Sequence, residues 1–185
     1  MSTRYKFWDE YKGYFATFAV VGWIDVFTRN EYREIFVESL SYCIKNKGLV
    51  VHAWVLMSNH VHLLISLKEN NPYSFSDVMR DLKKYTAMQI IKAIKENPSE
   101  SRKEWILELL NKAGNENSQN KNFQFWQHGN HPIEITDRQH YFNVLEYIHQ
   151  NPVRAGCVSL PEHYVWSSAC DYAGKKGLVD VGMDF

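Results

Sequence analysis

The sequence predicts an α+β domain, an antiparallel sheet with helices packed on it, and two observations indicate this class. Short segments rich in β-branched and aromatic residues alternate with longer segments whose apolar residues recur at helical spacing. Ser58-Asn59 places turn-forming residues between two apolar segments, which predicts a β-hairpin. The 185 residues, 45% hydrophobic and 15% aromatic, suit a single domain over residues 1–185, with its core at about 14–172.

The first half of the chain predicts three strands and two helices. The strands lie at residues 14–23, 49–57 and 60–67, and the helices at 31–47 and about 75–96. Asn30 is a suitable cap for the first helix, and Gly48 ends it. Ser74 or Ser76 can cap the second helix, which Asn97-Pro98 stops. Five apolar residues share one face of this second helix and are expected to be buried: Phe75, Val78, Met79, Leu82 and Ile90.

The second half predicts shorter elements and one further long helix. They are a helix at 102–110, a polar loop at 111–122, strand pieces at 123–127 and 132–135, and a helix from about 136 to 150. Thr136 and Gln139 form a capping box for that last helix, and Asn151-Pro152 is expected to end it. The order strand, helix, strand, strand, helix, strand is that of a ferredoxin-like fold, here followed by a C-terminal helix.

Composition narrows the classes of function. The 21 Lys and Arg balance the 21 Asp and Glu, whereas nucleic-acid-binding proteins are usually basic, so any DNA-binding surface would have to be local. Every apolar segment is shorter than the ~20 residues that a membrane span needs, and residues 1–12 lack the pattern of a signal peptide. Cys43, Cys157 and Cys170 form no Cys-x-x-Cys motif, which fits a reducing cytoplasm.

His60 and His62 flank Val61 at the start of the predicted strand 60–67. Alternate residues of a strand point to the same face, so the two imidazoles are expected side by side, with Val61 turned toward the core. Two neutral imidazoles on one rigid face form part of a metal site with open positions. A strand with two partly buried, hydrogen-bonded histidines is the alternative interpretation of so short a pattern.

The predicted C-terminal helix carries a candidate nucleophile, Tyr147. Successive helical residues turn by about 100°, which puts Tyr147 at the border of an apolar stripe. The stripe consists of Tyr141, Phe142, Leu145 and Ile148. Asn151, four residues after Tyr147, lies on the same side of the helix. A tyrosine at such a border can present its hydroxyl to a groove, although an ordinary amphipathic tyrosine with a solvated tip fits the same position.

Four motifs occur in order between about Tyr14 and Tyr172. They are Asn59-His60-Val61-His62-Leu63-Leu64, Phe125-Trp126-Gln127, Tyr147-Ile-His-Gln-Asn-Pro-Val-Arg-Ala-Gly156 and Pro161-Glu-His-Tyr-Val-Trp-Ser-Ser-Ala169. In this order and spacing they resemble the single-tyrosine HUH transposases, most of all the branch called REP-associated tyrosine transposases. The chain departs from that pattern at Ser58, where the family often has proline, and in its polar insertion near 111–122.

The resemblance implies an HUH variant of the ferredoxin-like fold and a metal-dependent single-stranded DNA endonuclease and strand transferase that acts on hairpin-containing DNA. It implies that His60 and His62 bind a divalent metal, Mg²⁺ or Mn²⁺, and that Asn151 is a third, polar ligand. Tyr147 would attack a phosphodiester to give a 5′-phosphotyrosine and a free 3′-OH. The relatives also imply a monomer or a homodimer.

Five residues are candidate DNA contacts: Arg80, Lys83, Lys84, Trp126 and Arg154. We expect the three basic residues of the helix at 75–96 to face the same groove as the histidines, although a solvated charged face is the more common origin of such a cluster. Trp126 could stack on a base, although packing in the core is the more common role of such a ring.

Two alternative functions use some of the same residues. A non-catalytic nucleic-acid-binding module derived from a transposase would have no use for the chemistry of Tyr147. A structural zinc site made of His52, His60 and His62 would bind metal tightly and would also leave Tyr147 without a role.

Overall fold

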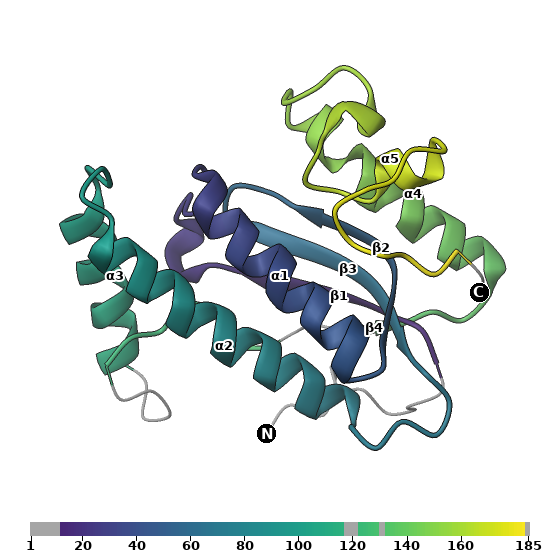
Figure 1. Ribbon diagram of the computed structural model, residues 1–185, viewed down its shortest axis with the longest axis horizontal. Helices are drawn as coiled ribbons and strands as arrows, with labels where there is room; N and C mark the ends of the chain where they lie inside the picture. The colour runs from purple at the N-terminus through teal and green to yellow at the C-terminus, as the bar shows by residue number, and fades with distance from the viewer. Residues whose placement is uncertain (1–11, 117–121, 130–131, 184–185) are drawn as a thin grey trace.

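A four-stranded antiparallel sheet in the order β2-β3-β1-β4 forms the centre of the protein (Figure 1). The computed structural model describes residues 12–116, 122–129 and 132–183. The strands are β1 (Tyr14–Ala19), β2 (Leu49–Leu56), β3 (His60–Leu67) and β4 (Ile133–Glu134). This order and the antiparallel pairing are those expected of the ferredoxin-like arrangement, so the predicted fold class is confirmed.

Two long helices cover one face of the sheet. Figure 1 shows α1 (Asn30–Asn46) and α2 (Phe75–Glu96) alongside each other in front of the strands, with α3 (Lys103–Asn115) beyond α2. The larger core forms between these helices and alternate strand residues such as Phe18, Val61 and Leu63, all of which are buried. The five α2 residues that the sequence assigned to the core are buried there as well.

A smaller core forms against α4 (Arg138–Arg154), and its strand residues alternate with those of the larger core. Leu64, Val55 and Ala53 contribute to it from the sheet, and Tyr141, Val144 and Ile148 from the helix. Because strand residues alternate between faces, α4 packs on the opposite face of the sheet from α1 and α2. His60 and His62 have the same parity as Leu64 and therefore lie on the α4 side.

The chain after α4 returns to the free edge of β2. A 3-10 helix, η2 (Pro161–His163), leads to Ser167, which forms a bridge with Val55, and then to α5 (Ala169–Tyr172). The N–H of Ser168 donates to the Trp54 carbonyl at 3.0 Å, and the buried His149 ring lies 2.8 Å from the Ser168 hydroxyl. The Trp-Ser-Ser motif thus fastens the C-terminal segment to the sheet. In the described part of the chain, no helix is long and apolar enough to cross a membrane.

Two strand and helix boundaries differ from the sequence-based expectation near the N-terminus. The first strand ends at Ala19 and not at Trp23, because Gly22 (φ 63°) and Trp23 (φ 55°) adopt left-handed backbone conformations in the 3-10 turn η1 (Val21–Trp23). Asn30 is the first residue of α1, and Arg29 occupies the cap position without a side-chain cap bond. Ser74 does cap α2, since its hydroxyl accepts from the N–H of Asp77.

The second half also has corrected boundaries. Asp137 caps α4 in place of Thr136, since the Asp137 carboxylate accepts the His140 N–H at 2.9 Å. The helix continues through Pro152 to Arg154, because a proline near the end of a helix removes a single N–H donor, and the N–H of Ala155 still bonds the Asn151 carbonyl at 2.9 Å. α3 reaches Asn115, within the segment expected to be a loop, and residues 117–121 of that segment lie outside the described residues.

Candidate active site

The histidine pair stands at the start of β3. The rings of His60 and His62 have their centroids 4.8 Å apart and their planes at 71°, so they are adjacent without stacking face to face. Val61 between them is buried in the larger core, as the strand alternation predicts. On the neighbouring strand, Ala19 pairs with His60 and Thr17 with His62. The pair is therefore fixed to the middle of a sheet and not to a loop.

Each histidine is oriented by one hydrogen bond to its Nδ1 atom. The Thr17 hydroxyl lies 2.7 Å from Nδ1 of His62, and Oδ1 of Asn59 lies 2.7 Å from Nδ1 of His60. An amide oxygen can only accept, so Nδ1 of His60 carries the proton and Nε2 presents a lone pair. Among the described residues, neither Nε2 atom has a hydrogen-bond partner. Hydrogen bonding of one ring nitrogen while the other stays available is the usual arrangement of metal-binding histidines.

Burial keeps both rings neutral. It lowers the pKa of His62 to about 3, with a further lowering from the neighbouring His60, and it lowers the pKa of His60 as well. Neutral imidazole is the form that binds a cation, and the pair has it at physiological pH.

Tyr147 of α4 meets the histidine pair. Its ring centroid is 5.3 Å from that of His62 and 5.8 Å from that of Phe15, in edge-on contacts. The guanidinium of Arg154, in the last turn of the same helix, lies 5.6 Å from the Tyr147 ring centroid. With 39% of its surface exposed, Tyr147 is supported on one side and accessible on the other. The structure thus brings Tyr147 of α4 against the His60 and His62 pair of β3, as the sequence led us to expect of these two distant segments.

Asn151 lies one helical turn after Tyr147, half-buried, with its Nδ2 donating to the Tyr147 carbonyl at 2.9 Å. That bond leaves Oδ1, the atom that binds cations, without a hydrogen bond among the described residues. The described contacts join Asn151 to Tyr147 and not to either histidine, so its assignment as a ligand stays a prediction.

The donor set fits a divalent cation that is only partly coordinated by protein. Two neutral imidazole nitrogens leave positions for further donors such as water and phosphate oxygens. Within the described ranges, no group of three or more His, Cys, Asp and Glu could hold a metal. His52 is unsuited to complete a zinc site, because its two ring nitrogens lie 2.9 Å from the Gly182 carbonyl and 2.8 Å from the Ser66 hydroxyl.

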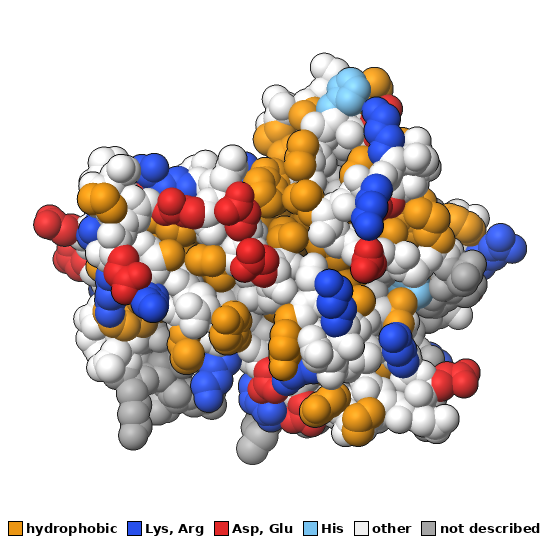
Figure 2. All heavy atoms as spheres, in the orientation of Figure 1, with side chains coloured by type: hydrophobic (Ala, Val, Ile, Leu, Met, Phe, Trp, Pro, Cys, Tyr) orange, Lys and Arg blue, Asp and Glu red, His pale blue; other side chains and the backbone are white. Residues whose placement is uncertain are grey.

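The basic residues of α2 do not face the histidines, which corrects the expectation of a shared groove. Arg80, Lys83 and Lys84 line a separate groove of about 1020 Å³ between α2 and residues 122–129, on the α1 and α2 side of the sheet. The helical stripe that packs on the sheet sets this direction. Lys92 and Lys95 also line the groove. On the face shown in Figure 2, Lys and Arg side chains lie among Asp and Glu side chains.

Trp126 is a core residue and offers no platform for a base. It is 5% exposed, its indole N–H donates to the Thr86 hydroxyl at 3.0 Å, and its ring stacks on Phe27 at 5.8 Å. The ring also meets Phe18 of β1 edge-on at 6.0 Å between centroids, within the larger core. The sequence motif therefore marks packing here, in line with the alternative interpretation of this tryptophan.

Sequence reasoning missed Trp23, an exposed tryptophan beside the histidine pair. Its ring centroid lies 5.7 Å from that of His60, and 55% of its surface is exposed. The sequence predicts that the first strand reaches Trp23, because residues 14–23 are rich in β-branched and aromatic side chains. In the structure, the left-handed turn at residues 22–23 separates Trp23 from that strand. Gly22 was the one signal in the sequence that a turn occurs here.

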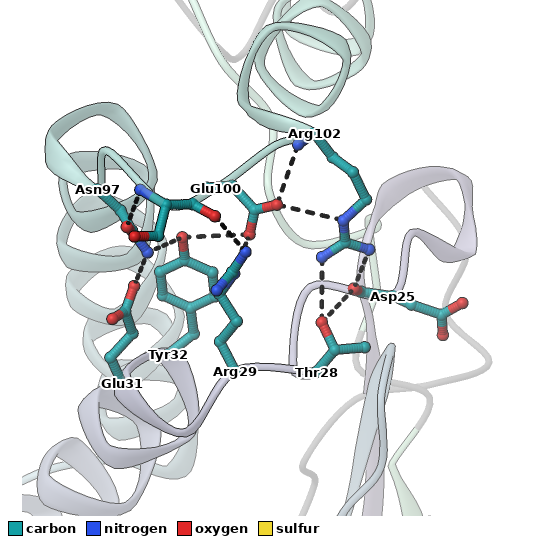
Figure 3. A network of polar contacts seen from close by, with 9 residues as sticks. Asp25, Thr28, Arg29, Glu31, Tyr32, Asn97, Glu100 and Arg102 are labelled. Carbon is teal, nitrogen blue, oxygen red and sulfur yellow. Dashed lines mark hydrogen bonds and ion pairs between the residues drawn. The ribbon is translucent and has the colours of Figure 1, made fainter.

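A polar network around the buried Glu100 braces the loop that precedes α1 (Figure 3). Glu100 is buried, and its carboxylate accepts from Arg29 at 2.8 Å and from Arg102 at 3.2 Å. Arg102 also donates to the Asp25 carbonyl at 3.0 Å, and the Asp25 carboxylate accepts the Ser58 hydroxyl at 2.5 Å. Ser58 lies in the turn that leads into His60, so the network links α3 to the start of the histidine strand.

Known proteins resemble this chain in sequence and in fold. Residues 24–108 match the family described as transposase, IS200 like; this region includes both histidines and ends before Tyr147. A solved structure of a REP-associated tyrosine transposase bound to a REP hairpin matches with a TM-score of 0.66 and 20% identity, covering 100% of this chain and 95% of that chain. None of the curated proteins matches. The resemblance inferred from the motifs is confirmed, and the fold is that of the REP-associated transposase.

Proposed function

We propose that this protein cleaves and rejoins single-stranded DNA next to a hairpin, with Tyr147 as the nucleophile. The chain resembles the IS200-like transposases and shares the fold of a REP-associated tyrosine transposase, which supports the proposal. The observation that carries the proposal is the contact of Tyr147 with His62 of the histidine pair. A partly exposed tyrosine beside two neutral, oriented imidazoles on one rigid surface supplies a nucleophile and cation-binding nitrogens for covalent phosphodiester chemistry.

The proposed step exchanges one phosphate ester for another. The Tyr147 oxygen forms a bond to phosphorus as the bond from phosphorus to the 3′ oxygen breaks, which leaves a 5′-phosphotyrosine and a strand that ends in 3′-OH. The phenolic proton is lost and the leaving 3′ oxygen gains one, so the step is neutral overall. Because the new ester keeps the energy of the old one, a 3′-OH can attack it and restore a phosphodiester without ATP.

A divalent cation, Mg²⁺ or Mn²⁺, held by His60 and His62 with Asn151 as the proposed third donor, would polarise a non-bridging phosphate oxygen. The protein's own residues fix the geometry. Thr17 and Asn59 hold the two rings, Phe15 supports Tyr147, and Arg154 brings a positive charge to the side of the nucleophile.

The groove along α2 is the proposed contact for the paired part of the DNA. The structural relative binds a REP hairpin, and a duplex stem presents closely spaced phosphates to basic side chains. Lys84 is exposed and forms no ion pair within the described residues, whereas Arg80 already pairs with Asp77 and Asp81. Lys84 is therefore the stronger of the two candidates for a phosphate contact.

The test is transfer of label from DNA to protein. Single-stranded DNA from the flanks of the chain's own gene is labelled on either side of the expected nick and incubated with Mg²⁺, Mn²⁺ or a chelator. Label 3′ of the nick should stay on the protein through denaturation, and label 5′ of it should leave as DNA ending in 3′-OH. Tyr147→Phe should give no linked band, whereas Tyr85→Phe, which changes an exposed tyrosine of α2, should behave as wild type.

Three results would contradict the proposal. A linked band in Tyr147→Phe would move the nucleophile to another residue. Metal-dependent cutting without a linked band would indicate hydrolysis. Hairpin binding without any cutting, with both metals, would favour the non-catalytic nucleic-acid-binding module instead.

A further inference from the structure

Trp23 is the exposed aromatic residue that the proposed chemistry leaves without a role. It is 55% exposed and has a left-handed backbone conformation with φ 55°, which bulky residues rarely adopt. Backbone outliers of this kind persist where the surrounding structure holds them, and they are concentrated at functional sites. The side chain gains little from burial in exchange, so packing alone does not explain its place.

Asn59 ties Trp23 to the histidine pair. Nδ2 of Asn59 donates to the Trp23 carbonyl at 3.2 Å, and Oδ1 of the same amide binds Nδ1 of His60. The indole ring stands at 71° to the His60 ring, with 5.7 Å between the centroids. The turn that orients His60 therefore also holds the tryptophan beside it.

Trp23 and Tyr147 lie at opposite ends of the histidine pair. Trp23 contacts His60 at the β2–β3 turn, whereas Tyr147 contacts His62 and Phe15, and Phe15 pairs with Leu64 farther along β3. Along the strand the order is therefore Trp23, His60, His62 and Tyr147. A phosphate at the histidines would have the nucleophile on one side and the exposed Trp23 indole on the other.

We propose that Trp23 stacks on the base of the nucleotide immediately 5′ of the scissile phosphate. This inference rests on the proposed function, because displacement at phosphorus places the attacking and leaving oxygens in line on opposite sides. If Tyr147 attacks from its end, the 3′ oxygen leaves toward Trp23 and carries its nucleotide with it. An exposed indole binds any base through its π face, so it holds that strand whatever its sequence.

Stacking at this position has a consequence for rejoining. Once the bond is broken, the strand ending in 3′-OH is no longer covalently attached to the phosphotyrosine. A base held on Trp23 keeps that 3′-OH near the phosphotyrosine and ready for the reverse attack. Loss of the indole should therefore lower the yield of rejoined DNA more than the rate of cleavage.

The ligand in the experiment is the DNA fragment ending in 3′-OH that wild-type protein releases on cleavage. Its affinity is measured for proteins that carry Tyr147→Phe, in the presence of chelator, so that no cleavage or rejoining occurs. Replacing Trp23 by Ala should weaken binding about tenfold, the scale of one base–aromatic contact, and Trp23→Phe should retain most of it. Trp105→Ala, which removes a similarly exposed tryptophan on α3, is the matched control and should change nothing. An abasic site at the last nucleotide should weaken wild type by the same factor and should not weaken Trp23→Ala further.

That non-additivity separates base stacking from mere support of His60, because a structural role would not depend on whether the base is present. Equal weakening of both proteins by the abasic site would overturn the inference even if the phosphotyrosine forms. Absence of the phosphotyrosine band would instead overturn the proposed function, and with it the assignment of this nucleotide.

Discussion

The Thr17 hydroxyl lies 2.7 Å from Nδ1 of His62, across the paired strands β1 and β3. Thr17→Val keeps the shape and removes the hydrogen bond, so the ring loses the partner that fixes its orientation. We expect metal affinity to fall roughly tenfold, the usual effect of losing such a partner. Titration of Mn²⁺ by calorimetry measures this. Thr136→Val, at an exposed position before α4, is the control, and equal affinities in the two variants would show that Thr17 has no such role.

His62→Ala is expected to abolish cleavage and leave hairpin binding largely intact. The proposed contacts to the stem lie in the α2 groove, on the other face of the sheet from His62. Gel shifts and cleavage assays on the same DNA separate the two effects. A loss of binding as large as the loss of cleavage would mean that the histidine supports the fold.

Lys84→Gln is expected to weaken hairpin binding and to reduce the slope of log affinity against log salt by about one, the effect of one phosphate contact. Arg80→Gln should have a smaller effect, because Asp77 and Asp81 already pair with Arg80. Lys175→Gln, at an exposed position after α5, serves as the control. A slope unchanged in Lys84→Gln would identify the residue as part of an ordinary solvated face.

The affinity of the groove should depend on pH through Lys83. Burial lowers the pKa of Lys83 to about 8, so the side chain is charged below that pH and loses its charge as the pH rises through it. Hairpin affinity should therefore decline between about pH 7 and about pH 9, whereas ordinary lysines stay charged in that range. Lys83→Arg keeps the charge and should remove the decline. A decline that persists in Lys83→Arg would have another origin.

Glu100→Gln should destabilise the fold by about 2 kcal/mol, because it breaks a buried charged contact with two partly exposed arginines. Burial tends to raise the pKa of Glu100, but the backbone and side chain of Arg102, together with Arg29, outweigh it and hold the pKa below its usual value. The ionised carboxylate thus stabilises the fold above its pKa in the unfolded chain. That contribution is lost as the pH falls through the lower pKa of the folded state. Urea unfolding at neutral and acidic pH should show a weaker acid dependence in Glu100→Gln than in wild type.

Local patterns in the sequence were enough to predict the β2–β3 hairpin and the side-by-side placement of His60 and His62. The alternation of His60, Val61 and His62 depends on strand geometry alone, and the structure preserves it. Helical periodicity puts Tyr147 at the border of the apolar stripe, and only the family-like motif that begins at Tyr147 singled it out as the nucleophile. Its contact with His62 required knowledge of which face of the sheet α4 covers, which periodicity does not give.

The features that the sequence could not supply depend on the packing of distant segments. Thr17 is the partner of His62 only through the register of β1 against β3. Trp126 and Trp23 both lie in segments predicted as strands, yet one ring is buried among aromatic side chains and the other is exposed after a left-handed turn. The direction of Arg80, Lys83 and Lys84 follows from the docking of α2 beside α1, on the far side from the histidines.

The bridge between Val55 and Ser167 also limits how copies of this protein can associate. The open edge of a sheet is a template on which another chain can add a strand. Here the N–H of Leu56 already bonds the Trp166 carbonyl at 2.9 Å, so the β2 edge is occupied by the chain's own C-terminal segment. The opposite edge is β4, which has only two residues, Ile133 and Glu134. Both described margins therefore resist the addition of a strand from another copy.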